Sequence, residues 1–472
     1  MRAEIHESEP DLLAARRWIG VAIGSLILAG IFALLLVIGR LPQLSPSFGD
    51  PLFFKRGLVV HVDLALVIWF YAFIAGLVQL LPGRASPVGR WTSGTAVGGV
   101  LLMMIGAGAR GAEPVLSNYV PVIDHPLFFA GLILFALSVL AAILRPRLLP
   151  SPNPAQLSRE VELAVRAAVV AFVVALTCFW GAYLATPSFL SPTDYFERVM
   201  WGGGHVLQFA TVAAMLGAWL VLLGSLTQRS VIGARAAAVL FALLVSPLFV
   251  APLFSLGGTD TPFYRLAFTR LMELAIFPVV LVVLALSIRS LRRARREGTL
   301  SAGYFRDRRF VGFLVSAGLT LTGFLLGAAI SGANTTVPGH YHAAIGGVTA
   351  SLMALTYELL APLGMSLDHP RAQRLMRWQL PVFGVGQLLF ALGFAFAGAH
   401  GAARKTYANE QHVRSLGEWL GLSVMGIGGL VAVAGGLLFL GLVAVAWRHR
   451  RPLPTHSGAR PILARPGEAH VK

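Results

Sequence analysis

The stretch TVPGHYHAAIG, Thr336 to Gly346, places His340 and His342 two residues apart at the start of a long apolar run. Successive residues of an α-helix are turned by about 100°, so these two imidazoles project about 200° apart. They cannot bind one metal ion from opposite sides. They can, however, serve two different centres that lie on either side of the same helix.

The chain around this stretch has the composition of a membrane protein. Of its 472 residues, 56% are hydrophobic and 12% are charged, and the mean hydropathy is +0.73. Such values are far from those of a soluble protein. We expect an all-α, polytopic membrane protein with twelve transmembrane helices, because twelve apolar runs have spanning length: 18–39, 58–81, 94–109, 126–144, 167–186, 203–226, 236–256, 267–288, 310–331, 341–363, 378–399 and 419–447.

The basic residues predict the orientation of these helices. Most of the 38 lysines and arginines fall in the two termini and in the loops after every second helix. Lys and Arg resist transfer across the membrane, so both termini are predicted to be cytoplasmic. The largest cluster, residues 289–309, lies on the same side, where anionic lipid accounts for the net charge of +17 without any nucleic acid.

The predicted organisation is simple. A cytoplasmic N-terminal segment (1–17) precedes one membrane domain (18–447), and a basic, disordered tail (448–472) follows it. No cleavable signal peptide is expected, because the first apolar run is too long and follows a charged start. The single cysteine, Cys178, cannot form an internal disulfide or a thiolate cluster, which leaves histidines as the soft metal ligands.

Four histidines are predicted to lie at one depth. His61, His205, His340 and His342 all fall within the first turn or two of a predicted helix that runs inward from the outer face. Any one of them could simply contact water or bond a carbonyl group. A shared depth instead favours haem, because a bis-histidine iron needs two facing helices with ligands at the same level.

These residues resemble those of subunit I of the haem-copper oxidase superfamily, which includes cytochrome c oxidases and nitric oxide reductases. His61 matches the low-spin haem ligand of helix 2, while His340 and His342 match the His-aromatic-His motif of helix 10. The stretch LSNYVPVIDHPLFFAG (116–131) is most similar to the B-type branch. Arg404 and Lys405 match the adjacent basic residues that hold haem propionates, with Lys replacing an Arg.

The resemblance implies two haems of unspecified type. The low-spin haem would be held by His61 and His342, and the high-spin haem, which binds O2 or NO, by His340. It also implies a bacterial inner (cytoplasmic) membrane and a respiratory chain. The expected partners are membrane lipid, a small subunit that carries the electron-entry site, and a cytochrome c or cupredoxin donor.

The copper site of the family is degenerate in this sequence. His205 matches the ligand of helix 6, but the paired ligands of helix 7 are replaced at about Ala251 and Pro252. One imidazole is not a copper site of the usual geometry. The tyrosine expected four residues after the helix 6 histidine is Phe209, and the lysine of the proton channel is replaced at about Val282.

Two carboxylates remain open to interpretation. Glu273 lies three residues after Arg270 on one helical face, so it either forms a structural ion pair or acts as a ligand or proton carrier near the high-spin haem. Asp63 either lines a polar cavity or transfers protons.

Three functional classes therefore stand. The first is a haem-copper oxidase-like oxidoreductase. The second is a non-catalytic electron-transfer or gas-sensing haem subunit that has lost its copper site. The third is a secondary transporter that uses the histidines for proton coupling, although the sequence lacks the inverted repeat that many transporters carry.

Overall fold

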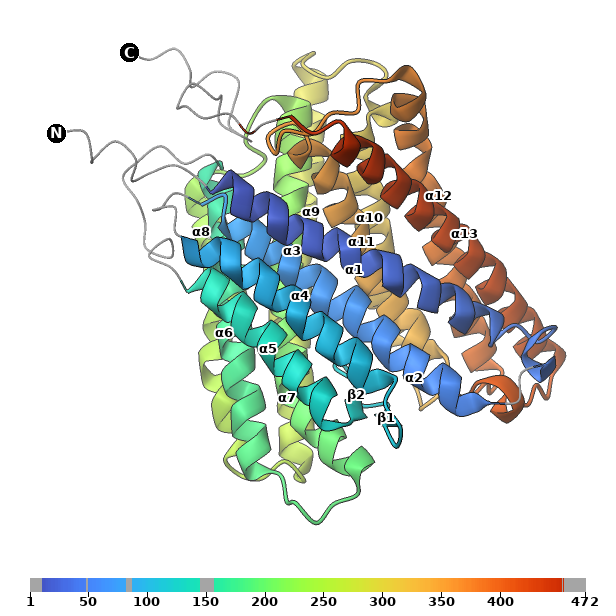
Figure 1. Ribbon diagram of the computed structural model, residues 1–472. Helices are drawn as coiled ribbons and strands as arrows, with labels where there is room; N and C mark the ends of the chain where they lie inside the picture. Colours follow the sequence, from blue (N-terminus) through green and yellow to red (C-terminus); the bar gives the residue numbers. More distant parts are fainter. Residues whose placement is uncertain (1–10, 48–49, 82–86, 145–156, 452, 454–472) are drawn as a thin grey trace.

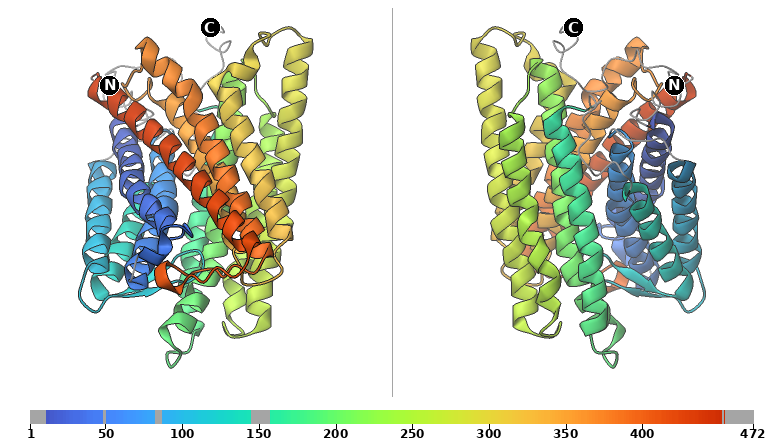
Figure 2. Two further views of the ribbon diagram at one scale, coloured as in Figure 1. Left: turned by 90° about the vertical axis from the view of Figure 1, so that its right-hand side faces the viewer. Right: turned by 90° about the vertical axis from the view of Figure 1, so that its left-hand side faces the viewer.

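The computed structural model describes residues 11–47, 50–81, 87–144, 157–451 and 453. The helices run roughly side by side in one bundle, and the described starts and ends of the chain lie at the same end of it (Figures 1 and 2). Trp447 near the end of the last helix packs beside Gly20 of the first. This arrangement agrees with two termini on one side of a membrane.

The N-terminal half begins with α1 (Leu12–Ile38) and a bent second rod. That rod consists of α2 (Pro51–Val62), a π-helical segment (Asp63–Ile68) and α3 (Trp69–Val78). Next come α4 (Pro87–Ala107), α5 (Pro126–Ile143), α6 (Arg159–Ala185) and α7 (Pro192–Thr227). Short strands β1 (Glu113–Val115) and β2 (Val122–Asp124) pair antiparallel between α4 and α5.

The C-terminal half continues with α8 (Ala234–Val245), which runs into a 3-10 segment (Ser246–Ser255). The later helices are α9 (Pro262–Arg296), α10 (Arg308–Ala328), α11 (Thr336–Leu359), α12 (Pro370–Ala399) and α13 (Leu416–Arg448). Single 3-10 turns lie at Ser45–Ser47, Tyr304–Arg306 and Ala408–Glu410.

Several helices begin with a proline in their first turn, directly after a capping residue. The side chains of Asp50, Ser191 and Thr261 accept hydrogen bonds from backbone N–H groups of α2, α7 and α9 respectively. Proline has no N–H to lose at this position, and the cap satisfies donors that the helix leaves free. The sequence thus defines where these helices start.

The polytopic helical architecture is confirmed. Ten of the described helices are long and apolar enough to cross a membrane, and Trp91–Ala107 is a shorter apolar helix. The two remaining predicted segments, 94–109 and 341–363, lie on α4 and α11. Helix α11 tolerates polar residues because most of its side chains are buried by neighbouring helices.

Some predicted boundaries are wrong. Helix α1 begins at Leu12, inside the segment assigned to the N-terminal extension, and α7 begins eleven residues before the predicted 203. These extra turns include charged residues such as Arg16, Arg17 and Asp194, which lower their hydropathy below that of an apolar run. His205 therefore lies roughly four turns into its helix rather than in the first two. Most of the predicted tail, 452 and 454–472, lies outside the described residues.

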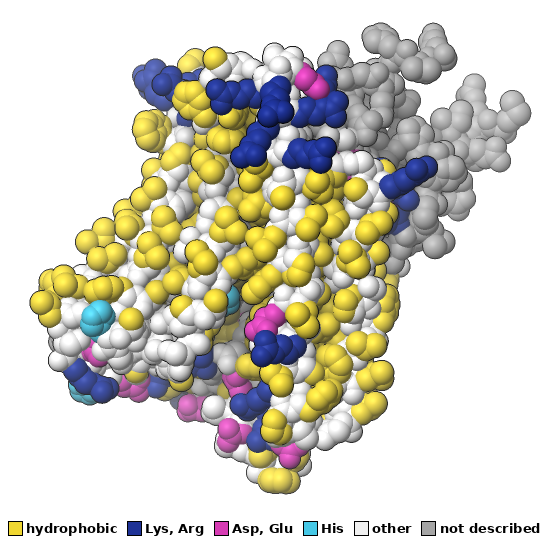
Figure 3. All heavy atoms as spheres, turned by 180° about the vertical axis from the view of Figure 1, so that it is seen from behind, with side chains coloured by type: hydrophobic (Ala, Val, Ile, Leu, Met, Phe, Trp, Pro, Cys, Tyr) yellow, Lys and Arg dark blue, Asp and Glu magenta, His cyan; other side chains and the backbone are white. Residues whose placement is uncertain are grey.

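The outer surface shows a wide hydrophobic band, with lysines and arginines gathered at the end where the chain starts and ends (Figure 3). That end includes the last turn of α9, which carries Arg293, Arg295 and Arg296. The hydrophobic band has the distribution that a bilayer requires.

Helices α12 and α13 lie side by side in both views of Figure 2 and approach each other closely. A Cβ atom at Gly428 of α13 would lie 2.3 Å from the backbone nitrogen of Phe390, and one at Gly393 of α12 would lie 2.3 Å from that of Met425. Helices in a membrane gain little from burying apolar area against one another, so such close backbone contact supplies much of their association.

We therefore expect Gly428→Leu to destabilise the bundle, because the clashing atoms belong to the backbone of α12 and cannot rotate away. Gly441→Leu on the same helix is the matched control, since a Cβ there meets no atom within 4 Å. The loss should be about 1–3 kcal/mol, measured as a lower melting temperature in detergent by size-exclusion after heating. Equal melting temperatures for the two variants would contradict this packing.

Candidate functional site

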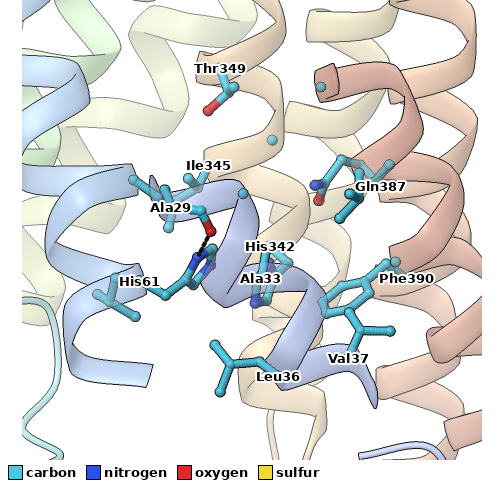
Figure 4. A pocket seen from close by; sticks show the side chains of 18 of the residues that line it. Ala29, Ala33, Leu36, Val37, His61, His342, Ile345, Thr349, Gln387 and Phe390 are labelled. Carbon is cyan, nitrogen blue, oxygen red and sulfur yellow. Dashed lines mark hydrogen bonds between the residues drawn. The ribbon is translucent and has the colours of Figure 1, made fainter. Parts of the chain in front are cut away.

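A cavity of about 220 Å³ lies between α1, α2, α11, α12 and α13. His61 and His342 both line it, and Figure 4 shows them reaching into it from different helices. Tyr341, between the two histidines of α11, lines the cavity as well. The fold thus brings together two imidazoles that are 281 residues apart in the sequence.

His61 is held by a carbonyl group of the neighbouring helix. Its Nδ1 lies 2.9 Å from the carbonyl oxygen of Ala29 on α1, so Nδ1–H donates to that oxygen. This tautomer leaves Nε2 with a free lone pair on the other side of the ring. The π-helical segment begins two residues later at Asp63, a feature that is frequent at functional sites.

His342 is held by aromatic packing. Its ring lies 4.5 Å from that of Phe390 and 6.1 Å from that of Phe394, both on α12. No hydrogen bond to His342 was found among the described residues. Its ring nitrogens are therefore available to a Lewis acid or to a hydrogen-bond donor.

The cavity has a cationic end formed by Arg40, Arg404 and Lys405. Arg40 is 3% exposed, donates to the carbonyl oxygens of Thr406 at 2.9 Å and Ala403 at 3.1 Å, and stacks over the Tyr407 ring at 4.8 Å. Arg40 was missed by the sequence analysis. The sequence feature that could have indicated Arg40 is its position directly after the first apolar run.

Lys405 has an unusual backbone conformation and a lowered side-chain pKa. Its backbone has φ 62°, a left-handed conformation that non-glycine residues seldom adopt and that often marks functional sites. Burial and the neighbouring Arg404, opposed by Glu197, lower the pKa of Lys405 to about 8. An acidic group of a ligand placed here would raise the pKa of Lys405 again.

The β1–β2 loop connects this cationic end to α7. Arg404 donates to the side-chain oxygen of Asn118 at 2.6 Å, and Lys405 donates to the carbonyl oxygen of Leu116. The side chain and backbone N–H of Asn118 in turn donate to Glu197. The basic pair is therefore fixed by contacts with segments nearly 300 residues away.

His340 faces away from the cavity, as the 200° spacing predicts. Its Nδ1 lies 2.7 Å from the carbonyl oxygen of Gly323 on α10, which leaves Nε2 free. The ring lies against Gly327, where an added Cβ would be 2.8 Å from it. His340 and His342 thus lie on opposite sides of α11.

Both ring nitrogens of His205 form hydrogen bonds within the protein. Nδ1 donates to the carbonyl oxygen of Trp201 at 2.8 Å, and Nε2 accepts from the hydroxyl of Tyr119 at 2.8 Å. Tyr119 has φ 68°, and burial together with Glu197 raises its pKa, so the phenol stays a neutral donor. Nothing in the sequence spacing pointed to this partner.

The other predicted positions lie apart from the cavity. Phe209 and Ala251 are fully buried, and Val282 is exposed on the outside of α9. Glu273 accepts a hydrogen bond from Arg270 at 2.6 Å, and neither residue lines the cavity. No group of three or more His, Cys, Asp or Glu residues with metal-binding geometry was found in the described part of the chain.

Asp63 and Gln387 are among the residues whose buried polar atoms have no hydrogen-bond partner in the described part of the chain. Both carboxylate oxygens of Asp63 are of this kind, as is Oε1 of Gln387, which lines the cavity one turn from Phe390 (Figure 4). Unpaired buried polar atoms are rare, and each one calls for an explanation such as a ligand.

Comparisons with known proteins agree with this geometry. The family model described as "Cytochrome C and Quinol oxidase polypeptide I" matches residues 14–432. An uncharacterized protein of Rickettsia prowazekii (strain Madrid E) is 26% identical over 90% of this chain and 94% of its own length. An uncharacterized protein of Aquifex aeolicus (strain VF5) is 30% identical over 74% of this chain and 84% of its own.

A solved structure of a heme-copper terminal oxidase dimer has a similar fold, with a TM-score of 0.72. It is 17% identical in sequence, and the similarity covers 92% of this chain and 84% of that one.

The Tyr119–His205 bond allows a direct test. Tyr119→Phe leaves the buried Nε2 of His205 without a donor, so it should lower the free energy of unfolding by about 1–3 kcal/mol. Tyr195→Phe is the control, because Tyr195, on the helix that carries His205, contacts the ring of Phe196, and a phenylalanine keeps that contact; no side-chain hydrogen bond of Tyr195 was found among the described residues. Detergent-based unfolding by SDS titration measures both, and equal stability would show that the bond contributes nothing.

Proposed function

Because the chain belongs to the cytochrome c and quinol oxidase polypeptide I family, we propose that it is a respiratory membrane oxidoreductase subunit with a low-spin haem between His61 and His342. The single observation that carries this proposal is the cavity that both histidines line. The subunit I-like oxidoreductase class follows from the family itself. The ligand assignment, the electron path and the partners are our proposals.

The residues of the cavity fit a haem. His61 presents Nε2 because its Nδ1–H is bonded to Ala29, and His342 has no hydrogen bond among the described residues. The remaining walls are mostly apolar, which suits a porphyrin face. A bis-histidine haem, when bound, carries single electrons.

The cationic end fits the acidic edge of the same group. Arg40, Arg404 and Lys405 would hold propionates, and their positive charges would favour the reduced state of a bound haem. The pKa of Lys405, which burial and Arg404 lower to about 8, supports this role, because an acidic group of a ligand would raise it again.

His340 would hold a second, high-spin haem on the other side of α11. Its Nδ1 bond to Gly323 orients the ring in the same way that Ala29 orients His61. In this scheme electrons arrive from a cytochrome c or cupredoxin at the outer face, aided by a small partner subunit, and O2 or NO binds at the second haem. Glu273 forms the ion pair with Arg270 that was one of its two predicted roles, and its other role, as a ligand or proton carrier at the second haem, stays a prediction. The basic end of Figure 3 supports cytoplasmic termini in a bacterial inner membrane.

A second function is favoured by one observation. Both nitrogens of His205 are engaged by Trp201 and Tyr119, so the residues at this position do not fit a copper ion. The alternative is therefore a non-catalytic electron-transfer or gas-sensing haem subunit. Binding of carbon monoxide to the reduced protein distinguishes the two: a carbon monoxide-sensitive high-spin haem supports turnover, and a solely six-coordinate spectrum contradicts it.

Substitution of each histidine tests the haem ligands. His61→Ala and His342→Ala should each abolish the low-spin bis-histidine signature, because one axial ligand is lost, while His340→Ala should retain it. Resonance Raman and visible spectra of both redox states measure this. If His61→Ala and His342→Ala both fold and their spectra are unchanged, the assignment of these residues as haem ligands is rejected and the transporter class stays open.

Substitution of Arg40 tests whether the cationic end of the cavity holds the haem propionates. Arg40→Leu should lower the midpoint potential of the low-spin haem by an amount on the order of tens of millivolts, because a poorly solvated positive charge is removed. Arg40→Lys should restore most of it. Arg110→Leu removes the same charge from an exposed outer position, so its potential should be unchanged. A redox titration in which Arg40→Leu matches Arg110→Leu would contradict this role.

A further inference from the structure

Helices α10 and α11 pack closely on the side of α11 that carries His340. A Cβ atom at Gly323 of α10 would lie 2.7 Å from the backbone nitrogen of Ala344, and one at Gly347 of α11 would lie 2.9 Å from the carbonyl oxygen of Ser316. Glycines allow two helices to approach this closely, but they provide no protruding side chain that would stop one helix from sliding along the other. The register of this interface therefore depends on polar contacts.

Two hydrogen bonds cross the interface in the same register. Nδ1 of His340 bonds the carbonyl oxygen of Gly323, and Oγ of Ser316 donates to the carbonyl oxygen of Gly347, each at 2.7 Å. Gly323 and Ser316 are seven residues apart on α10, and so are His340 and Gly347 on α11. The two bonds therefore lie about 10 Å apart along one antiparallel pair of helices. Because both bonds require the same register, sliding that weakens one also weakens the other.

Ser316 differs from the other hydroxyl residues of α10. Thr320 and Thr322 donate to carbonyl oxygens of their own helix four residues earlier, Ser316 at 2.8 Å and Gly318 at 2.9 Å. This local bond is the usual one for a hydroxyl side chain inside a helix. The hydroxyl of Ser316 instead donates to α11, so its bond joins two helices.

Trp219 of α7 holds the Ser316 hydroxyl in this direction. Its Nε1–H donates to Oγ of Ser316 at 2.8 Å, and both side chains are fully buried. The indole is itself fixed by edge-to-face packing against Phe313 of α10, with ring centroids 5.3 Å apart. Because Oγ accepts from the indole on one side, its own hydrogen is directed to Gly347 on the other. We call the chain Trp219–Ser316–Gly347 the relay.

We propose that Ser316 is a positioning residue for His340. Through the relay it holds α10 and α11 in the register at which the carbonyl group of Gly323 accepts from Nδ1–H of His340, and so it directs Nε2 toward the second haem. A bonded Nδ1–H fixes the tautomer and the orientation of a ligating imidazole. The inference rests on the proposed function for the haem, whereas the relay and the His340 bond belong to the protein alone.

Three variants test the relay. Ser316→Ala removes Oγ and with it both hydrogen bonds of the relay. Trp219→Phe removes only the indole donor and leaves the bond from Ser316 to Gly347, so its effect should be smaller in the same direction. Thr322→Ala is the matched control on α10, because the hydroxyl that it removes bonds only its own helix.

Resonance Raman spectra of the reduced protein report the bond between the high-spin iron and its histidine. The unaltered protein and Thr322→Ala should show one iron–histidine stretching band at the same frequency. Ser316→Ala should shift and broaden that band, because the ring is no longer held in one orientation, and Trp219→Phe should lie between. A purely structural role would lower the melting temperature without moving the band, so an unmoved band in Ser316→Ala overturns the proposal.

A second measurement does not need the high-spin haem. Magic-angle-spinning NMR of protein labelled with nitrogen-15 histidine, reduced and kept under carbon monoxide, detects Nδ1–H of His340 as the signal that His340→Ala lacks. This proton should move upfield in Ser316→Ala, because its hydrogen bond weakens, and stay in place in Thr322→Ala. If Ser316→Ala does not fold, Trp219→Phe gives the same comparison.

The two measurements separate the relay from the proposed function. Equal proton shifts in Ser316→Ala, Trp219→Phe and Thr322→Ala overturn the relay, whether or not a haem is bound. Absence of any iron–histidine band from the unaltered protein instead counts against the second haem, and the NMR result then decides the relay by itself.

Discussion

The geometry of α11 is the constraint on which the rest of the site depends. Residues two positions apart on an α-helix differ in direction by about 200°, so His340 faces α10 when His342 faces the cavity with α1, α2 and α12. The helix can do this only because neighbours surround it on both sides. Each compartment then supplies its own means of orienting a ring. Ala29 and Gly323 bond His61 and His340, whereas Phe390 packs against His342.

The outer loops complete the compartment by joining distant segments. Asn118 links Glu197 of α7 to Arg404, and Lys405 reaches the carbonyl group of Leu116. Tyr119 and Lys405 both adopt left-handed backbone conformations, which cost energy and persist only where surrounding contacts enforce them. The β1–β2 loop therefore contacts both the cationic end of the cavity and His205.

His205 is bonded within the protein at both ring nitrogens. The chain belongs to the cytochrome c and quinol oxidase polypeptide I family, yet the ring of His205 is fully bonded to Trp201 and Tyr119. Ala251 and Pro252 lie in a 3-10 segment that carries no metal ligand at those positions. Trp201 accepts from Nδ1 of this buried imidazole, and the phenol of Tyr119, from the β1–β2 loop, donates to Nε2.

The sequence by itself determined the helical membrane architecture, the ranges of most helices and the opposite directions of His340 and His342, because hydropathy and helical period are local properties. The sequence did not indicate that Arg40 and Gln387 line the cavity or that Tyr119 contacts His205. Arg40 bonds Thr406, 366 residues away, and Tyr119 bonds His205, 86 residues away, and no local period records such pairings. Only the tertiary structure decided which polar groups face the cavity, because that depends on how the helices pack against one another.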